Sequence, residues 1–174
     1  WQYMAIQKYG PKQLRRLQGR RRASLALFAT FVELAALVVE GGGEVSFEWP
    51  RHCVGWAQGP LSRFIANFGL HEGLCDGCAF GMVDAHGEPV LKPWRIVTTC
   101  SRLADSLSRG RCRHEQGFIH SHLEGGHITP SSGLYPEALC RAALSALFPW
   151  TNDRAPAMPV VPVEPQPFYA MESG

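Results

Sequence analysis

The chain has 174 residues, of which 45% are hydrophobic and 18% are charged. This composition is that of a folded globular domain with an apolar core, and it excludes an intrinsically disordered chain. The formal net charge is only +2, and no uninterrupted apolar run reaches the ~18 residues of a membrane-spanning helix, so we expect no membrane partner.

The first segment, 1–22, is basic and polar. Its seven basic residues are not accompanied by any acidic residue: Lys8, Lys12, Arg15, Arg16, Arg20, Arg21 and Arg22. A run of this kind can bind phosphate groups, and it is also typical of a flexible arm or a solvated helix face. The chain begins at Trp1 rather than at Met, so we expect it to be a trimmed product or a fragment of a longer protein.

Both helices and strands are predicted in the rest of the chain. Apolar residues spaced three or four apart predict helices over 23–40 and 59–68, and glycines end each of them. Residues 45–47, 74–80 and 95–99 are predicted strands, and residues 101–107 and the segment after Pro136 are predicted helices. A long loop rich in His and Gly lies between the last two helices, and a proline-rich tail occupies 151–174.

This order predicts an α/β fold with about three strands in a partial Rossmann-like sheet, flanked by helices. Three strands are few for a complete doubly wound domain, which suggests half of one. We therefore divide the chain into a basic arm (1–22), an α/β half-domain (23–150) and a proline-rich tail or linker (151–174).

Three motifs occur in one order: "VSFEWP" (45–50), "DGCAFG" (76–81) and "KPWRIVTT" (92–99). In that order they resemble the carboxyl-terminal half of cytosine-5 DNA methyltransferases. The resemblance implies that Glu48 holds the target cytosine, that Arg95 contacts the base or a phosphate, and that Lys92 contacts the backbone. It further implies a base flipped out of DNA, with S-adenosylmethionine as methyl donor.

The same layout resembles reading frames in phages and in polyproteins of mobile elements such as retrotransposons. Neither the family's Pro-Cys nucleophile nor its Gly-rich donor loop is found in these 174 residues. We therefore expect the chain to be inactive alone and to need the upstream part of the same polyprotein. Its expected location is intracellular, in the nucleus or cytoplasm.

Each of these residues also has a simpler explanation. Glu48 is equally compatible with a strand-end carboxylate in water. Lys92 and Arg95 are also typical of charged residues that protect the edge of a sheet from aggregation.

A second group of residues points to a metal. Cys112, His114, His120 and His122 lie close together in the His-rich loop, and Cys75-Asp-Gly-Cys78 is a two-residue-spaced cysteine pair upstream of them. Zinc favours four Cys or His ligands, and a loop without its own apolar core gains order from a metal.

The alternative function is therefore a non-catalytic module that binds nucleic acid or is stabilised by zinc. A third option, a Cys–His catalytic pair such as Cys53 or Cys78 with His114, has no supporting motif. An exposed loop with ordinary histidines also remains open.

Overall fold

The computed structural model describes residues 2–121 and 133–149. The predicted tail 151–174 and the candidate ligand His122 therefore lie outside the described residues. In chain order the elements are α1 (Gln2–Glu40), β1 (Ser46–Pro50), η1 (Val54–Ala57), α2 (Gly59–Asn67), β2 (His71–Asp76), η2 (Gly77–Phe80), β3 (Pro93–Thr98), α3 (Ser101–Ser108) and α4 (Glu137–Leu147).

The mixed α/β composition and the three strands are confirmed, although the strand limits differ from those predicted. β1 continues to Pro50, and the strand predicted over 74–80 lies earlier, at His71–Asp76. At Gly77 the chain leaves the sheet, because the Gly77 amide donates to the carbonyls of Leu91 and Lys92 instead of to a strand neighbour. The short 3-10 helix η2 follows, and it contains Cys78.

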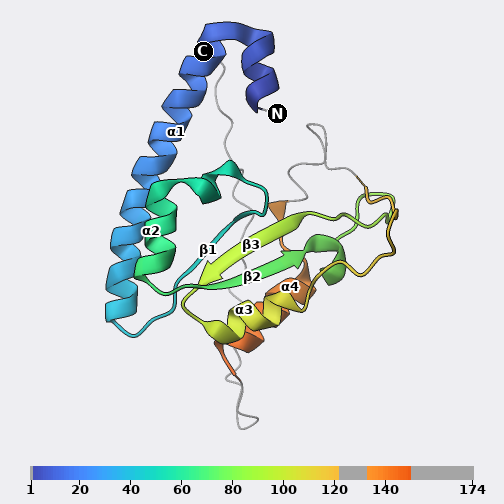
Figure 1. Ribbon diagram of the computed structural model, residues 1–174. Helices are drawn as coiled ribbons and strands as arrows, with labels where there is room; N and C mark the ends of the chain where they lie inside the picture. The colour runs from blue at the N-terminus through green and yellow to red at the C-terminus, as the bar shows by residue number, and fades with distance from the viewer. Residues whose placement is uncertain (1, 122–132, 150–174) are drawn as a thin grey trace, which may run out of the picture.

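The sheet has the order β1-β3-β2, and both neighbouring pairs are antiparallel. This corrects the Rossmann-like part of the prediction, because a Rossmann sheet is built from parallel strands. A parallel return needs a crossover, usually a helix, and the connection from β2 to β3 contains only the short η2. α2 connects β1 to β2, so these two strands run parallel to each other on either side of β3, in a split β-α-β arrangement (Figure 1).

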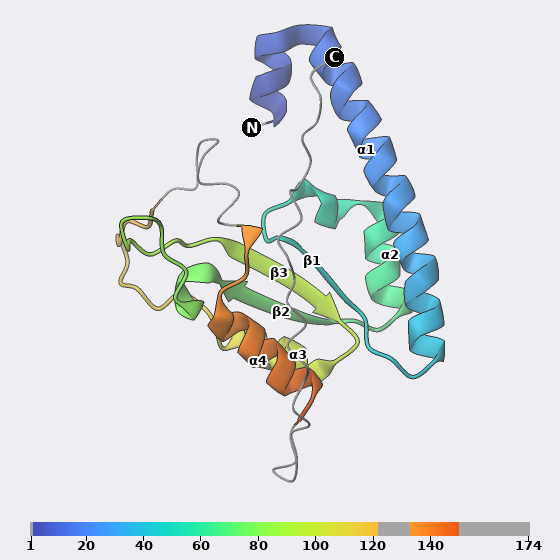
Figure 2. The same cartoon turned by 180° about the vertical axis from the view of Figure 1, so that it is seen from behind.

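Helices cover both faces of the sheet (Figures 1 and 2). An apolar cluster lies on each side. One cluster joins α1, η1 and α2 to the sheet and is rich in aromatic residues, with Phe28, Trp56, Phe64 and Val97 buried. The other lies beneath α3 and α4. Its buried members are Cys75, Met82, Val90, Trp94, Ile96, Cys100, Leu103, Leu107, Leu139 and Ala146.

α1 is longer than predicted, because the expected basic arm is helical from Gln2 and joins the predicted helix 23–40. A kink lies at Gly10, where φ is 67°, next to Pro11. The amino-terminal part of α1 projects away from the sheet (Figures 1 and 2). Among the basic residues of the arm, Lys12, Arg15, Arg16, Arg20, Arg21 and Arg22 are exposed.

The rest of α1 packs through only one of its faces. Phe28 and Ala35 are buried against the domain, whereas Leu27, Leu34 and Leu37 are exposed. Within the described residues, the helix from Gly10 to Glu40 is the one candidate that is long and apolar enough to cross a membrane, judged by length and composition. Core helices of soluble proteins and signal sequences have the same length and composition.

Candidate metal centre

Four potential metal ligands from two separate segments meet at one end of the sheet. Cys78 comes from η2, directly after β2. Cys112 and His114 follow α3 in an irregular segment, and His120 ends that segment beside the bridge between Val90 and Ser121. The four ligand atoms all lie within 4.8 Å of one another.

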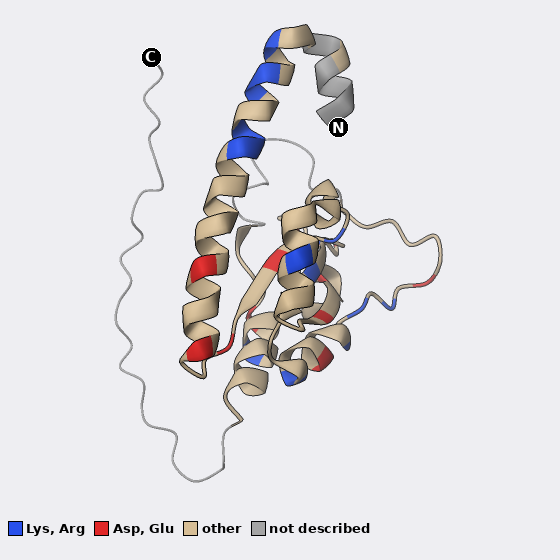
Figure 3. Cartoon of the chain, turned by 60° about the vertical axis from the view of Figure 1, so that its left-hand side comes forward, with Lys and Arg blue, Asp and Glu red and all other residues tan. Residues whose placement is uncertain are grey.

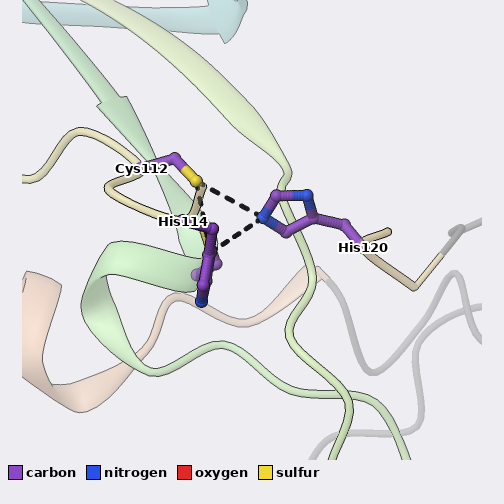
Figure 4. Close-up of side chains that lie close together, drawn as sticks. Cys112, His114 and His120 are labelled. Carbon is purple, nitrogen blue, oxygen red and sulfur yellow. Dashed lines mark hydrogen bonds between the residues drawn. The ribbon is translucent and has the colours of Figure 1, made fainter. Parts of the chain in front are cut away.

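Cys112, His114 and His120 turn toward one another, at separations close to those of a tetrahedral metal site (Figure 4). Cys112 Sγ lies 3.3 Å from His114 Nδ1 and 3.4 Å from His120 Nε2, and the two ring nitrogens are 3.1 Å apart. A tetrahedron built on zinc with two Cys and two His ligands has edges of about 3.3–3.8 Å. The side chains therefore converge as ligands do, and no exposed carboxylate belongs to the group.

Asp76 fixes the backbone that carries Cys112. Its side chain is buried, and its Oδ2 accepts from the Cys112 amide at 2.9 Å and from Arg111 Nε at 3.2 Å. The Asp76 amide in turn donates to the Gly110 carbonyl at 2.8 Å. The end of β2 and the segment after α3 are thus tied together two residues before Cys78.

The other side of the group is fixed by a turn and an aromatic contact. The Ser121 amide donates to the Pro89 carbonyl at 2.8 Å, and its hydroxyl donates to Asp84 Oδ2 at 2.6 Å. These bonds place the neighbouring His120. The His114 ring stacks on Phe118, with centroids 4.1 Å apart and planes 10° from parallel.

Cys78 is a thiol when no metal is bound. Burial raises its pKa to about 12, and the neighbouring Cys112 thiol contributes to the same rise. A high pKa does not suit a nucleophilic cysteine, which needs a thiolate near neutral pH. This counts against the Cys78–His114 catalytic pair, whereas a bound cation would displace the proton and stabilise the thiolate.

Of the four predicted ligands, the structure brings three together: Cys112, His114 and His120. His122 lies outside the described residues. The fourth member of the group is Cys78, which the sequence indicated only as half of the Cys75–Cys78 pair. Cys75 itself faces the core beneath α3, fully buried, and burial raises its pKa to about 12.

The residues expected from the methyltransferase resemblance do not form one site. Glu48 accepts a hydrogen bond from the Tyr135 hydroxyl at 2.7 Å, on the side of the sheet that α4 covers. Arg95 lies on the opposite side, with its guanidinium 4.4 Å from the centre of the Trp56 ring and in an ion pair with Glu72. Alternation along the strands explains this, because Glu48 is opposite Ile96 and Arg95 is opposite Trp49.

Lys92 interacts electrostatically with Glu48. Its ammonium is 5.3 Å from the centre of the Trp94 ring. Burial lowers the pKa of Lys92, and the negative charge of Glu48 opposes that shift. Lys92 and Glu48 are therefore an electrostatic pair at the edge of the sheet, next to Tyr135.

Comparisons of the chain with protein-family models, curated proteins and solved structures gave no match. A function for the chain is therefore inferred from the geometry of the four Cys and His ligands and from the distribution of charge.

Proposed function

We propose that the chain is a non-catalytic nucleic-acid-binding module stabilised by a structural zinc ion. The observation that carries this proposal is the convergence of Cys78, Cys112, His114 and His120, whose ligand atoms lie within 4.8 Å of one another. Two Cys and two His ligands form a donor set typical of zinc. Four protein ligands close the coordination sphere, and a closed sphere is typical of a structural site.

The position of the group favours a structural role as well. Residues 111–120 have no helix or strand of their own, and His114, Phe118 and Ile119 are exposed. A segment that buries so little apolar surface gains little stability from packing. A metal that joins this segment to η2 supplies the missing free energy, since binding to a folded site stabilises the folded state.

The nucleic-acid part of the proposal is supported by the uneven charge. The described acidic and basic side chains are mixed over the sheet and its helices, but one stretch of α1 carries Arg15, Arg16, Arg20, Arg21 and Arg22 without an acidic residue (Figure 3). A basic helix that projects from the domain can contact backbone phosphates and release their counterions.

The methyltransferase hypothesis stays a prediction, and the described residues favour it less. Glu48 and Arg95 face opposite sides of the sheet, and the sequence has no donor loop. Calorimetry with S-adenosylmethionine tests it directly. Donor binding, together with methyl transfer to DNA that Glu48→Gln abolishes, would favour the enzyme over the module.

Metal content is the decisive measurement for the zinc centre. We expect about one zinc per chain by elemental analysis of protein purified without chelator, since the four residues form one site. Cys78→Ser and Cys112→Ser should each lose the metal. Cys140→Ser is the matched control, because Cys140 is a partly buried free cysteine on α4 that does not belong to the group. Equal zinc content in all three variants would exclude the proposed centre.

Nucleic-acid binding is measured separately, by fluorescence anisotropy of a labelled oligonucleotide at several salt concentrations. We expect Arg15→Gln with Arg16→Gln to weaken binding and to reduce the salt dependence, because each phosphate contact contributes about 0.7–0.9 to the slope. An affinity that does not change with salt would contradict a phosphate-binding helix.

A further inference from the structure

An arginine-lined cavity lies next to the metal-ligand group. It has a volume of about 460 Å³. Its lining consists of Cys78, Ala79, Arg109, Arg111, Arg113 and His114. Two of the four proposed ligands thus form part of its wall, and the other polar groups in the wall are the three arginines.

Packing around Gly110 determines where these arginines lie. α3 ends at Ser108, and the Gly110 amide donates to the Leu107 carbonyl at 2.9 Å. A Cβ at Gly110 would lie 2.2 Å from the Phe80 ring, so the chain passes close to η2 at this point. Arg109 and Arg111 flank this contact on either side, and Arg113 lies between Cys112 and His114.

The charge in the cavity is only partly compensated. Asp76 pairs with Arg111 and also with Arg51, at 2.8 Å, so one carboxylate serves two guanidinium groups. Among residues 2–121 and 133–149, neither Arg109 nor Arg113 forms an ion pair with a carboxylate. A zinc ion bound by two thiolates and two neutral imidazoles would add no net charge. The cavity therefore keeps an excess of positive charge when the metal is bound.

We infer that this cavity binds a phosphate group of a nucleotide or of a nucleic-acid strand. Arginine presents N–H donors in a planar fork that matches phosphate oxygens, and two guanidinium groups without a carboxylate partner supply several such donors. A bound metal would fix the position of Arg113 in the cavity wall, because it would hold the neighbouring residues Cys112 and His114. The inference rests on the proposed function for the source of the phosphate and for the metal that fixes the positions of the arginines.

The test compares two double variants of the full chain, both loaded with zinc. Arg109→Gln with Arg113→Gln removes the uncompensated charges of the cavity and leaves the Arg111–Asp76 pair intact. Arg63→Gln with Arg102→Gln is the matched control, because both residues are exposed and neither lines the cavity. The ligands are inorganic phosphate, adenosine monophosphate and a single-stranded oligonucleotide, titrated by calorimetry or anisotropy.

We expect the cavity variant to bind phosphate at least about tenfold more weakly than the control, since a hydrogen bond to a charged group contributes ~1.5–3 kcal/mol. Binding of inorganic phosphate and of the mononucleotide identifies a free phosphate as the ligand. If only the oligonucleotide binds, with a salt slope reduced by about 1.4 in the cavity variant, the ligand is a strand phosphate.

Equal affinities of the two double variants for every ligand would overturn the inference, and so would the absence of binding to the zinc-loaded parent chain. Zinc content is measured on the same samples. Failure to load zinc would refute the proposed centre, but the comparison of the two arginine variants would still decide whether the cavity binds phosphate.

Discussion

Asp76 is the buried charge on which the geometry of the metal-ligand group depends. Its carboxylate accepts from Arg51, from Arg111 and from the Cys112 amide. The side chain of Asp76 is 4% exposed and that of Arg51 is 16% exposed. Removing one partner of such a pair leaves the other charge without compensation in a poorly solvated place.

We expect Asp76→Asn to lower the free energy of unfolding by roughly 2–3 kcal/mol, because Arg51 loses its carboxylate and the Cys112 amide loses a charged acceptor. Urea denaturation monitored by circular dichroism measures the change. The control is Glu137→Gln, which breaks the exposed Glu137–Arg141 pair on α4 and should cost no more than about 0.5 kcal/mol. A similar loss in both variants would contradict a special role for Asp76.

Tyr135 and Glu48 give a pH-dependent contribution to stability. Burial raises the pKa of Tyr135 above its usual value, and its hydrogen bond to Glu48 raises it further. A folded-state pKa above the unfolded one, about 10, means that the contribution is complete below pH ~10 and is lost as the pH rises through the folded-state pKa.

We therefore expect the parent chain to lose stability at alkaline pH more steeply than Tyr135→Phe, which has no phenol to ionise. Thermal unfolding at a series of alkaline pH values compares the two, and an ultraviolet titration of tyrosinate identifies the group. Glu48→Gln should lower the pKa of Tyr135 without returning it to the usual value, because burial is the larger cause. Identical alkaline profiles in the parent and Tyr135→Phe would refute this coupling.

At the scale of single residues, the sequence indicates that Cys and His residues form a metal site, but it does not identify all four ligands. Cys112, His114 and His120 are close in sequence, so their density in one loop is visible. Cys78 joins them only because the end of β2 hydrogen-bonds to the segment after α3. That contact spans more than thirty residues of chain, and no local pattern encodes it. The sequence spacing would allow Cys75 as a ligand just as well as Cys78. Cys75 lies within β2, however, and its side chain points into the core.

At the scale of elements, the close approach of α3 to β2 is set by Gly73. A Cβ at Gly73 would lie 3.0 Å from the Ala104 carbonyl oxygen and 3.2 Å from the Ala104 Cα. Both atoms belong to the backbone of α3, so the contact cannot be relieved by rotating a side chain. The helix or the strand would have to move.

We expect Gly73→Ala to destabilise the fold by about 1–3 kcal/mol, the usual cost of overpacking a core. Gly19→Ala is the opposing control: it lies in α1, where an added Cβ would meet nothing within 4 Å, and should stabilise the chain by up to ~1 kcal/mol. Chemical denaturation of the two variants measures both effects. A neutral Gly73→Ala would show that α3 is not packed as closely as described.

The elements themselves are largely predictable, because their signals are local. Apolar spacing and the Gly59-Pro60 start indicate α2, and Pro136 indicates the start of α4. Strand pairing depends on residues far apart in sequence, so the antiparallel order β1-β3-β2 could not be inferred from the same patterns. For the basic arm the sequence leaves a flexible arm and a solvated helix face open, and the structure has it helical, with only a kink at Gly10 beside Pro11.

At the scale of the whole molecule, the metal-ligand group and the two apolar clusters are separate sources of stability. The aromatic cluster joins α1, α2 and β1 without any of the four ligands. The second cluster joins α3 and α4 to the sheet, and the ligand group lies at its margin, where Phe80 and Met82 adjoin Cys78. The clusters bury apolar side chains on both faces of the sheet, whereas most residues of the loop carrying Cys112 to His120 are exposed.

Removing the metal should therefore open one part of the molecule and leave the rest folded. We expect a chelator to increase amide hydrogen exchange in η2 and over residues 111–121, while amides of β1, β3 and α2 stay protected. Saturating zinc at 100 times its dissociation constant should stabilise the folded chain by about 2.7 kcal/mol, because the metal binds only the folded site. Hydrogen exchange read by mass spectrometry and thermal unfolding measure the two effects.

Cys78→Ser should reproduce the exchange pattern of the chelated protein even with zinc present, and Cys140→Ser should not. The comparison isolates the metal from the effect of losing a cysteine, since both substitutions replace a partly buried thiol with a hydroxyl. Loss of helical circular dichroism throughout the chain on chelation would mean that the two clusters cannot hold the sheet without the metal. Unchanged exchange in 111–121 would mean that no metal ties this loop to η2.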